Sequence, residues 1–125
     1  MICDEYFTAW DNLDIDGYLA CIHEDYEITF HATGKVMRLE EFSSQIGSMM
    51  VSAKFENRRL IYENEDILVT HSKTTFGDGS REAVLQSTLK KTGFFGGQKL
   101  AQHHCHQKSD PDVQEKTCKY TQQRY

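Results

Sequence analysis

The side chain best placed to do chemistry is His31, which follows the alternating segment Tyr26-Glu-Ile-Thr-Phe30 just before a turn. Imidazole accepts or donates a proton near neutral pH, so a histidine at a strand end can act as a general acid or base. If a bulge turns the strand end, His31 faces the interior beside Tyr6. If the alternation continues, Phe30 faces inward and His31 faces outward. The first alternative makes His31 a catalytic candidate.

Tyr6 and Trp10 are four residues apart, so they share one face of a predicted helix. A phenol on that face can donate a hydrogen bond to a ligand carbonyl, and an indole can line an apolar pocket. The same face can equally be the core side of the helix. Tyr6 is therefore the second catalytic candidate, and Trp10 is a ligand-binding candidate.

Further ligand-binding candidates come from predicted strands and from the third helix. Polar side chains in phase with apolar ones can orient a ligand, pair across strands or lie at a subunit interface. Apolar side chains beside them can shape the walls of a pocket. These candidates are Phe30, Met50, Phe55, His71, Glu82 and Gln86.

The segment His103-His-Cys-His106 has the composition of a metal tract. Zinc needs ligands that converge tetrahedrally, whereas neighbouring residues of a strand point to opposite faces. We therefore expect no metal site. The sequence also has no glycine-rich nucleotide-binding motif, no nucleophile elbow and no H-E-x-x-H motif, so we expect no cofactor.

The composition of the chain limits the classes of partner that it can bind. The chain has 125 residues, enough for one core, and a net charge of -5. That charge argues against binding to nucleic acid or to an anionic membrane, because phosphate binding needs clustered basic residues. No apolar run approaches the roughly 20 residues that cross a bilayer. The early acids and the four separated cysteines predict a cytoplasmic protein with reduced thiols.

The elements that must position these residues follow in a readable order. Two short helices come first, the second capped by Asp14, and a strand at 26–30, a turn and a short extension at 36–38 follow. A third helix covers 39–50. Predicted strands then occupy 55–62, 67–76, 81–90 and about 94–105, with a hairpin turn at Gly77-Asp-Gly79. We expect one domain over 1–108 and an extended or frayed tail over 109–125.

This order of elements resembles the nuclear-transport-factor-2-like superfamily, with its SnoaL-like and ketosteroid-isomerase-like members. The residues that carry the resemblance are Tyr6-Phe-Thr-Ala-Trp10, Asn12-Leu-Asp-Ile-Asp-Gly17 and His23-Glu-Asp-Tyr26. The likeness covers about residues 3–92. It implies an α+β fold in which a curved, mostly antiparallel sheet wraps around the N-terminal helices as a cystatin-like cone. It also implies a pocket between helices and sheet, and a homodimer formed through the sheet face.

The resemblance carries over to the ketosteroid isomerases at one residue only. Their oxyanion-hole tyrosine corresponds to Tyr6, whereas the place of their general-base aspartate falls on Phe30. Phenylalanine cannot move a proton, and no acid near 85–87 replaces their second donor. We therefore do not expect their mechanism here.

Two hypotheses of function remain. In the first, the protein binds a small apolar or mixed-polarity molecule in the cone, with or without a cofactor-free proton-transfer, hydration, hydrolytic or isomerisation step. In the second, it is a non-catalytic dimeric interaction or assembly module. An open pocket supports the first hypothesis, and a cone filled by Trp10, Phe30 and Phe55 supports the second.

Overall fold

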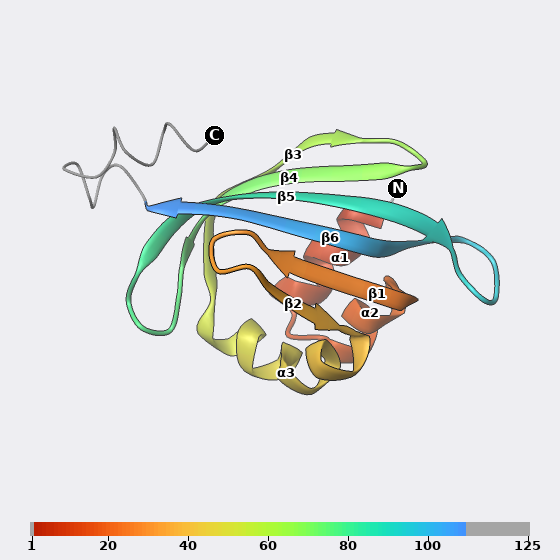
Figure 1. The fold of residues 1–125 in the computed structure, drawn as a ribbon, viewed down its shortest axis with the longest axis horizontal. Helices are drawn as coiled ribbons and strands as arrows, with labels where there is room; N and C mark the ends of the chain where they lie inside the picture. The colour runs from red at the N-terminus through yellow and green to blue at the C-terminus, as the bar shows by residue number, and fades with distance from the viewer. Residues whose placement is uncertain (1, 110–125) are drawn as a thin grey trace.

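The computed structural model describes residues 2–109 and contains three helices and six strands in one curled sheet (Figure 1). The predicted tail over 109–125 begins one residue too early, because Ser109 is the last residue of β6, and residues 110–125 lie outside the described residues. The elements are α1 (Ile2–Asp11), α2 (Ile15–Ala20), β1 (Ile22–Phe30), β2 (Lys35–Arg38), α3 (Leu39–Ser52), β3 (Lys54–Glu63), β4 (Ile67–Thr75), β5 (Arg81–Thr92) and β6 (Gln98–Ser109).

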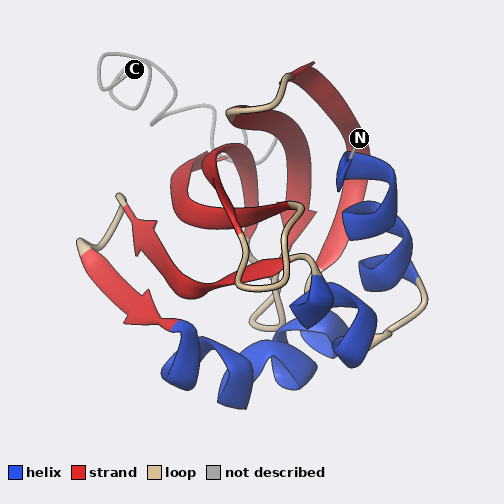
Figure 2. Cartoon of the chain, turned by 90° about the vertical axis from the view of Figure 1, so that its right-hand side faces the viewer, coloured by secondary structure: helices blue, strands red, loops and turns tan. Residues whose placement is uncertain are grey.

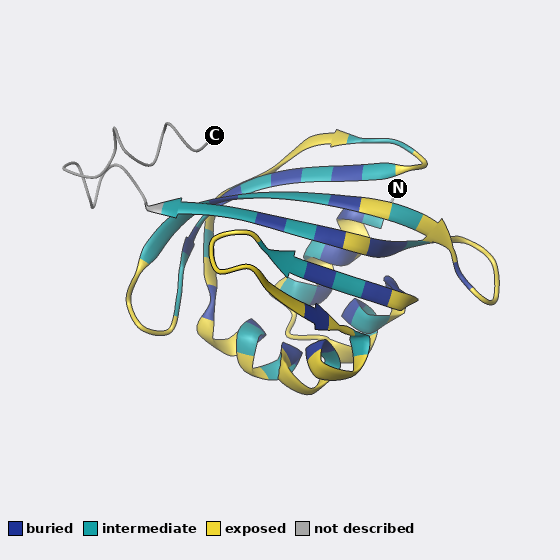
Figure 3. Ribbon diagram, in the orientation of Figure 1, coloured by how far each residue is buried: buried dark blue, intermediate teal, exposed yellow. Residues whose placement is uncertain are grey.

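The strands follow the order β2-β1-β6-β5-β4-β3, and every neighbouring pair is antiparallel except β1 and β6. Figure 2 shows the strands curling into an incomplete barrel, with the helices along its open side. Buried and less buried residues alternate along the strands, because successive side chains point to opposite faces (Figure 3). The predicted α+β fold class, a curved, mostly antiparallel sheet around the helices, is confirmed.

Local chemistry explains the helices. The side chain of Asp14 caps α2, since its Oδ1 accepts a hydrogen bond from the Gly17 amide at 2.9 Å. A Cβ at position 17 would collide with the Asp14 carboxylate in its capping position, so a larger residue there would displace the cap. On α3, Phe42, Ile46 and Met50 recur every four residues and are all buried.

The last strand differs from its prediction. We expected an irregular strand over about 94–105, but β6 begins at Gln98 and lies in the middle of the sheet. A turn closed by the hydrogen bond from the Gly93 amide to the Gly97 carbonyl precedes it. Phe94 and Phe95 sit in that turn and are 82% and 97% exposed. The prediction began the strand directly after a turn at Thr92-Gly93, whereas the turn extends to Gly97 and its two phenylalanine rings do not join the sheet.

No helix among residues 2–109 is both long and apolar enough to span a bilayer.

Candidate functional site

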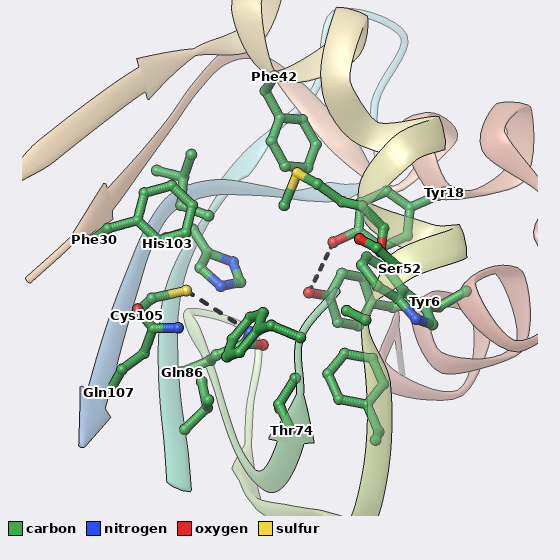
Figure 4. A pocket seen from close by; sticks show the side chains of 17 residues that line it. Tyr6, Tyr18, Phe30, Phe42, Ser52, Thr74, Gln86, His103, Cys105 and Gln107 are labelled. Carbon is green, nitrogen blue, oxygen red and sulfur yellow. Dashed lines mark hydrogen bonds between the residues drawn. The ribbon is translucent and has the colours of Figure 1, made fainter. Parts of the chain in front are cut away.

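A cavity of about 110 Å³ lies between the inner face of the sheet and the helices (Figure 4). Seventeen residues line it. They are Tyr6, Trp10, Tyr18, Ile28, Phe30, Phe42, Met49, Ser52, Ala53, Phe55, Thr74, Phe76, Val84, Gln86, His103, Cys105 and Gln107.

Strand alternation builds the sheet side of this cavity. On β6, His103, Cys105 and Gln107 are two residues apart and therefore share the inner face. On β5, Val84 and Gln86 share it in the same way. The lining residues range from buried ones such as His103, which is 2% exposed, to the exposed Ser52 near the end of α3.

His103 is the most unusual polar group on the wall. Its Nδ1 lies 3.0 Å from the hydroxyl oxygen of Thr88, which is also buried. Its Nε2 has no hydrogen-bond partner among the described residues. Burial, with a smaller contribution from His104, lowers the pKa of His103 from 6.5 to about 3. The ring is therefore neutral at physiological pH.

Two tyrosines face the cavity from α1 and α2. The Tyr18 hydroxyl donates a hydrogen bond to the Tyr6 hydroxyl at 2.9 Å, and both rings are buried (Figure 4). Burial raises the pKa of Tyr6, and it raises the pKa of Tyr18 well above its ordinary value. Both phenols therefore keep their protons.

Gln86 and Cys105 form the polar floor between β5 and β6. The Gln86 amide nitrogen donates to the Cys105 sulfur at 3.7 Å, and its amide oxygen accepts from the Thr70 hydroxyl at 3.4 Å. Burial raises the pKa of the Cys105 thiol to about 12. Cys105 is therefore a packed thiol, since nucleophilic attack needs the thiolate.

The cavity is uncharged throughout. No aspartate, glutamate, lysine or arginine belongs to its lining among residues 2–109. The guanidinium of Arg58 lies in a small adjoining recess that shares Trp10 and Phe55 with the cavity. Its charge is already paired, because Arg58 Nη2 lies 2.6 Å from Asp11 Oδ2, and its guanidinium carbon lies 4.0 Å from the centre of the Phe7 ring.

Five predicted site residues meet at this cavity. Tyr6 and Trp10 reach it from α1, Phe30 from β1, Phe55 from β3 and Gln86 from β5. Aromatic contact holds part of this set together, since the rings of Trp10 and Phe55 are 5.1 Å apart. What these five residues bind remains a prediction.

His31 lies outside the cavity. The irregularity in β1 falls near its start, between Ile22 and Glu27, so no bulge turns the strand end. Alternation therefore points Phe30 inward and leaves His31 exposed. His31 Nε2 lies 2.9 Å from His104 Nδ1, and the His31 ring stacks on His106 with centroids 4.3 Å apart.

Three more predicted residues, Met50, His71 and Glu82, also lie away from the cavity lining. Met50 is buried on the core side of α3, and its neighbour Met49 lines the cavity instead. His71 alternates with the buried Thr70 and Ser72, so it lies on the outer face of β4.

Glu82 shares the phase of Val84 but sits near the start of β5, beyond the lining. Burial is the main cause that raises its pKa, with a smaller contribution from Asp78. Its role in ligand binding, like those of Met50 and His71, remains a prediction without support from the cavity geometry.

His103 and Tyr18 line the cavity although the sequence did not predict either as a wall residue. His103 was considered only as part of a metal tract, yet its spacing from Cys105 signals a shared face once β6 is known to be central. Within residues 2–109, no group of three or more histidine, cysteine, aspartate or glutamate side chains is arranged to hold a metal ion.

No protein-family model matches the chain, and no curated protein matches it. Several solved structures match the chain. An NTF-2 like protein of unknown function from Burkholderia xenovorans superposes with a TM-score of 0.67 at 14% identity, covering 90% of this chain and 87% of that one. A putative ketosteroid isomerase from Shewanella frigidimarina gives 0.58 at 12% identity, covering 84% and 91%.

A domain of unknown function with a cystatin-like fold from Nostoc punctiforme gives a TM-score of 0.59 at 12% identity, covering 94% of this chain and 79% of that one. Likeness at these identities establishes the fold and not an activity. The chain has the NTF2-like, cystatin-like fold, as its resemblance predicted.

Proposed function

From a chain with the NTF2-like, cystatin-like fold, we propose a protein that binds a small, neutral, largely apolar molecule in the cavity between its helices and its sheet. The observation that carries the proposal is an open cavity with uncharged walls, in which Trp10, Phe30 and Phe55 leave space instead of filling the cone. Apolar walls with a few placed polar groups are typical of small-molecule sites.

Size limits the ligand. An engineered apolar cavity of about 150 Å³ holds a benzene molecule. The present cavity of about 110 Å³ suits a single small ring or a chain of similar bulk, with further atoms extending past Ser52 toward solvent. The ligand is therefore small at its buried end.

Charge limits the ligand as well. Transferring an ion into a site without a counter-charge is strongly unfavourable. The lining offers no such charge among the described residues, and Arg58 in the adjoining recess is paired with Asp11. A neutral ligand is the one that these walls accept.

The titratable groups of the cavity wall are better suited to binding a ligand than to transferring a proton. A general acid or base works best when its pKa lies near the working pH. Burial moves the pKa values of Tyr6, Tyr18 and Cys105 upward and that of His103 down to about 3. The proposal therefore assigns these groups to ligand binding.

A second proposal concerns assembly. We propose that two copies pair through the outer face of the sheet, which none of the three helices covers (Figure 2). On that face Tyr62 and Leu89 are 54% and 44% exposed, opposite the partly buried Val69 and Ile67. Such a pair is compatible with a ligand in each cavity.

The test of ligand binding is a thermal-shift screen of neutral ring compounds. A ligand at about 100 times its dissociation constant stabilises by about 2.7 kcal/mol, which raises the melting temperature by roughly 10 °C. Replacing Val84 by Phe fills the cavity and should remove the shift. Val69→Phe, which adds the same ring on the outer face of β4, should keep it. Equal shifts in both variants would place the binding elsewhere.

A further inference from the structure

We infer that the ligand carries an uncharged hydrogen-bond acceptor, such as a carbonyl oxygen, and that the Nε2–H of His103 donates a hydrogen bond to it. The inference rests on the proposed function and names the ligand class of the same cavity. It makes His103 a specificity-determining residue.

One ring nitrogen of His103, Nε2, has no hydrogen-bond partner among the described residues. Two buried side-chain atoms lack a hydrogen-bond partner among residues 2–109, Tyr26 Oη and His103 Nε2. Of these two residues, only His103 lines the cavity, and Figure 4 shows its imidazole on the wall beside the open space. Leaving a buried donor or acceptor unpaired is costly, so an unpaired nitrogen on a ring that lines a cavity marks a contact that a ligand can supply.

The contact with Thr88 indicates which nitrogen of the His103 ring carries the proton. If Nδ1 carries the proton, it donates to Thr88 Oγ1, and then both the Thr88 hydroxyl proton and the Nε2 lone pair lack partners among the described groups. If Nε2 carries the proton, the Thr88 hydroxyl donates to Nδ1 and only Nε2–H lacks a partner. The second arrangement satisfies more groups. His103 therefore presents a proton to the cavity.

The neighbouring polar groups present protons as well. Tyr6 already accepts a hydrogen bond from Tyr18, and its own hydroxyl proton has no acceptor among residues 2–109. The amide oxygen of Gln86 is occupied by the Thr70 hydroxyl. The cavity thus offers donors from His103 on β6 and Tyr6 on α1, which face it from opposite walls (Figure 4).

A carboxylate would also accept these hydrogen bonds, but it would bring a charge that the wall does not balance. The low pKa of His103 supports this exclusion, because the ring stays neutral and cannot serve as a counter-ion. A ketone, aldehyde, amide or ester oxygen fits both requirements.

The test compares two probes of nearly equal shape, cyclohexanone and methylenecyclohexane. Dissociation constants from NMR titration of the full chain should favour cyclohexanone roughly tenfold, the value of one buried hydrogen bond. In His103→Phe, which keeps a ring and removes the donor, this preference should vanish. A long-range ¹H–¹⁵N spectrum of the wild-type protein should show the Nε2–H tautomer of His103, and this measurement needs no variant.

Equal affinities for the two probes in the wild-type protein overturn the inference and leave the proposed function intact. An Nδ1–H tautomer overturns it in the same way. Binding of neither probe overturns the inference together with the proposed function. A tenfold preference that persists in His103→Phe assigns the donor to another residue and also contradicts the inference.

Discussion

At the scale of single residues, His103 combines complete burial with one satisfied and one unsatisfied nitrogen. Its environment accepts the neutral ring and rejects the charged one, because burial removes the hydration that a cation needs. The burial of a neutral His103 therefore affects stability as well as binding. It makes the folded state sensitive to acid.

Stability should fall as the pH drops from about 6.5 toward 3. In that window the unfolded chain protonates His103 and the folded chain does not, since the folded pKa is about 3 and the ordinary value is 6.5. The free energy of unfolding should lose up to about 1.4 kcal/mol per pH unit from this residue. Urea unfolding at several pH values should show a flatter dependence for His103→Gln. Parallel curves for the two proteins would refute the assigned burial.

The position of His31 leads to a separate prediction. Because His31 is exposed and contacts His104 and His106 outside the cavity, His31→Ala should leave the affinity for cavity ligands unchanged. Trp10→Ala, which removes a wall residue, should weaken it several-fold. Isothermal titration of both variants with the same ligand makes the comparison. Loss of affinity in His31→Ala would restore the sequence-based assignment of this histidine to the site.

At the scale of elements, alternation and capping were readable from the sequence, and long-range pairing was not. The Asp14 cap, the buried face of α3 with Phe42 and Ile46, and the hairpin at 77–80 all follow from neighbours in the chain. The central place of β6 follows from its parallel pairing with β1, which joins residues about 75 positions apart, such as Phe30 and Cys105. Local patterns carry no information on that contact.

The difference between local patterns and long-range pairing also explains which residues of the candidate site were predicted. Tyr6, Trp10, Phe30, Phe55 and Gln86 were found because each lies on the apolar face of its own element. His103 was not found, because its value depends on which strands flank it. Met49 was not predicted as a wall residue for a related reason, since helical spacing identifies a buried face but not which edge of that face borders a cavity. A ligand contact of Met50 stays a prediction.

The cap of α2 gives a prediction at this scale. Asp14→Ala should lower the free energy of unfolding by about 1 kcal/mol, because the Gly17 amide loses its acceptor. Asp16→Ala, two residues further along and within the first turn of the same helix, is the matched control and should cost clearly less. Chemical denaturation measures both variants. An equal loss in the two variants would show that general charge near the helix start, rather than the cap, stabilises α2.

At the scale of the whole molecule, the two faces of the sheet differ in what covers them. The inner face packs on the helices and holds the cavity. The outer face carries Tyr62, Val69 and Leu89, which no helix of the described chain covers. The proposed pairing of two copies would use this outer face.

Light scattering coupled to gel filtration should therefore give twice the mass of the chain. Val69→Lys places a charge on the outer face of β4 and should shift the protein toward the monomer. Val51→Lys, on the exposed side of α3, is the control and should leave the mass unchanged. A monomeric wild-type protein, or a Val69→Lys variant that stays dimeric, would contradict the proposed interface.

The central claim is that a neutral small molecule occupies the cavity between helices and sheet. Its most direct test is an amide chemical-shift titration of the ¹⁵N-labelled protein with cyclohexanone. The account predicts saturable shifts that concentrate around Gln86, His103 and Cys105 and that disappear in Val84→Phe. Shifts confined to the outer face of the sheet, or shifts that Val84→Phe leaves unchanged, would contradict it.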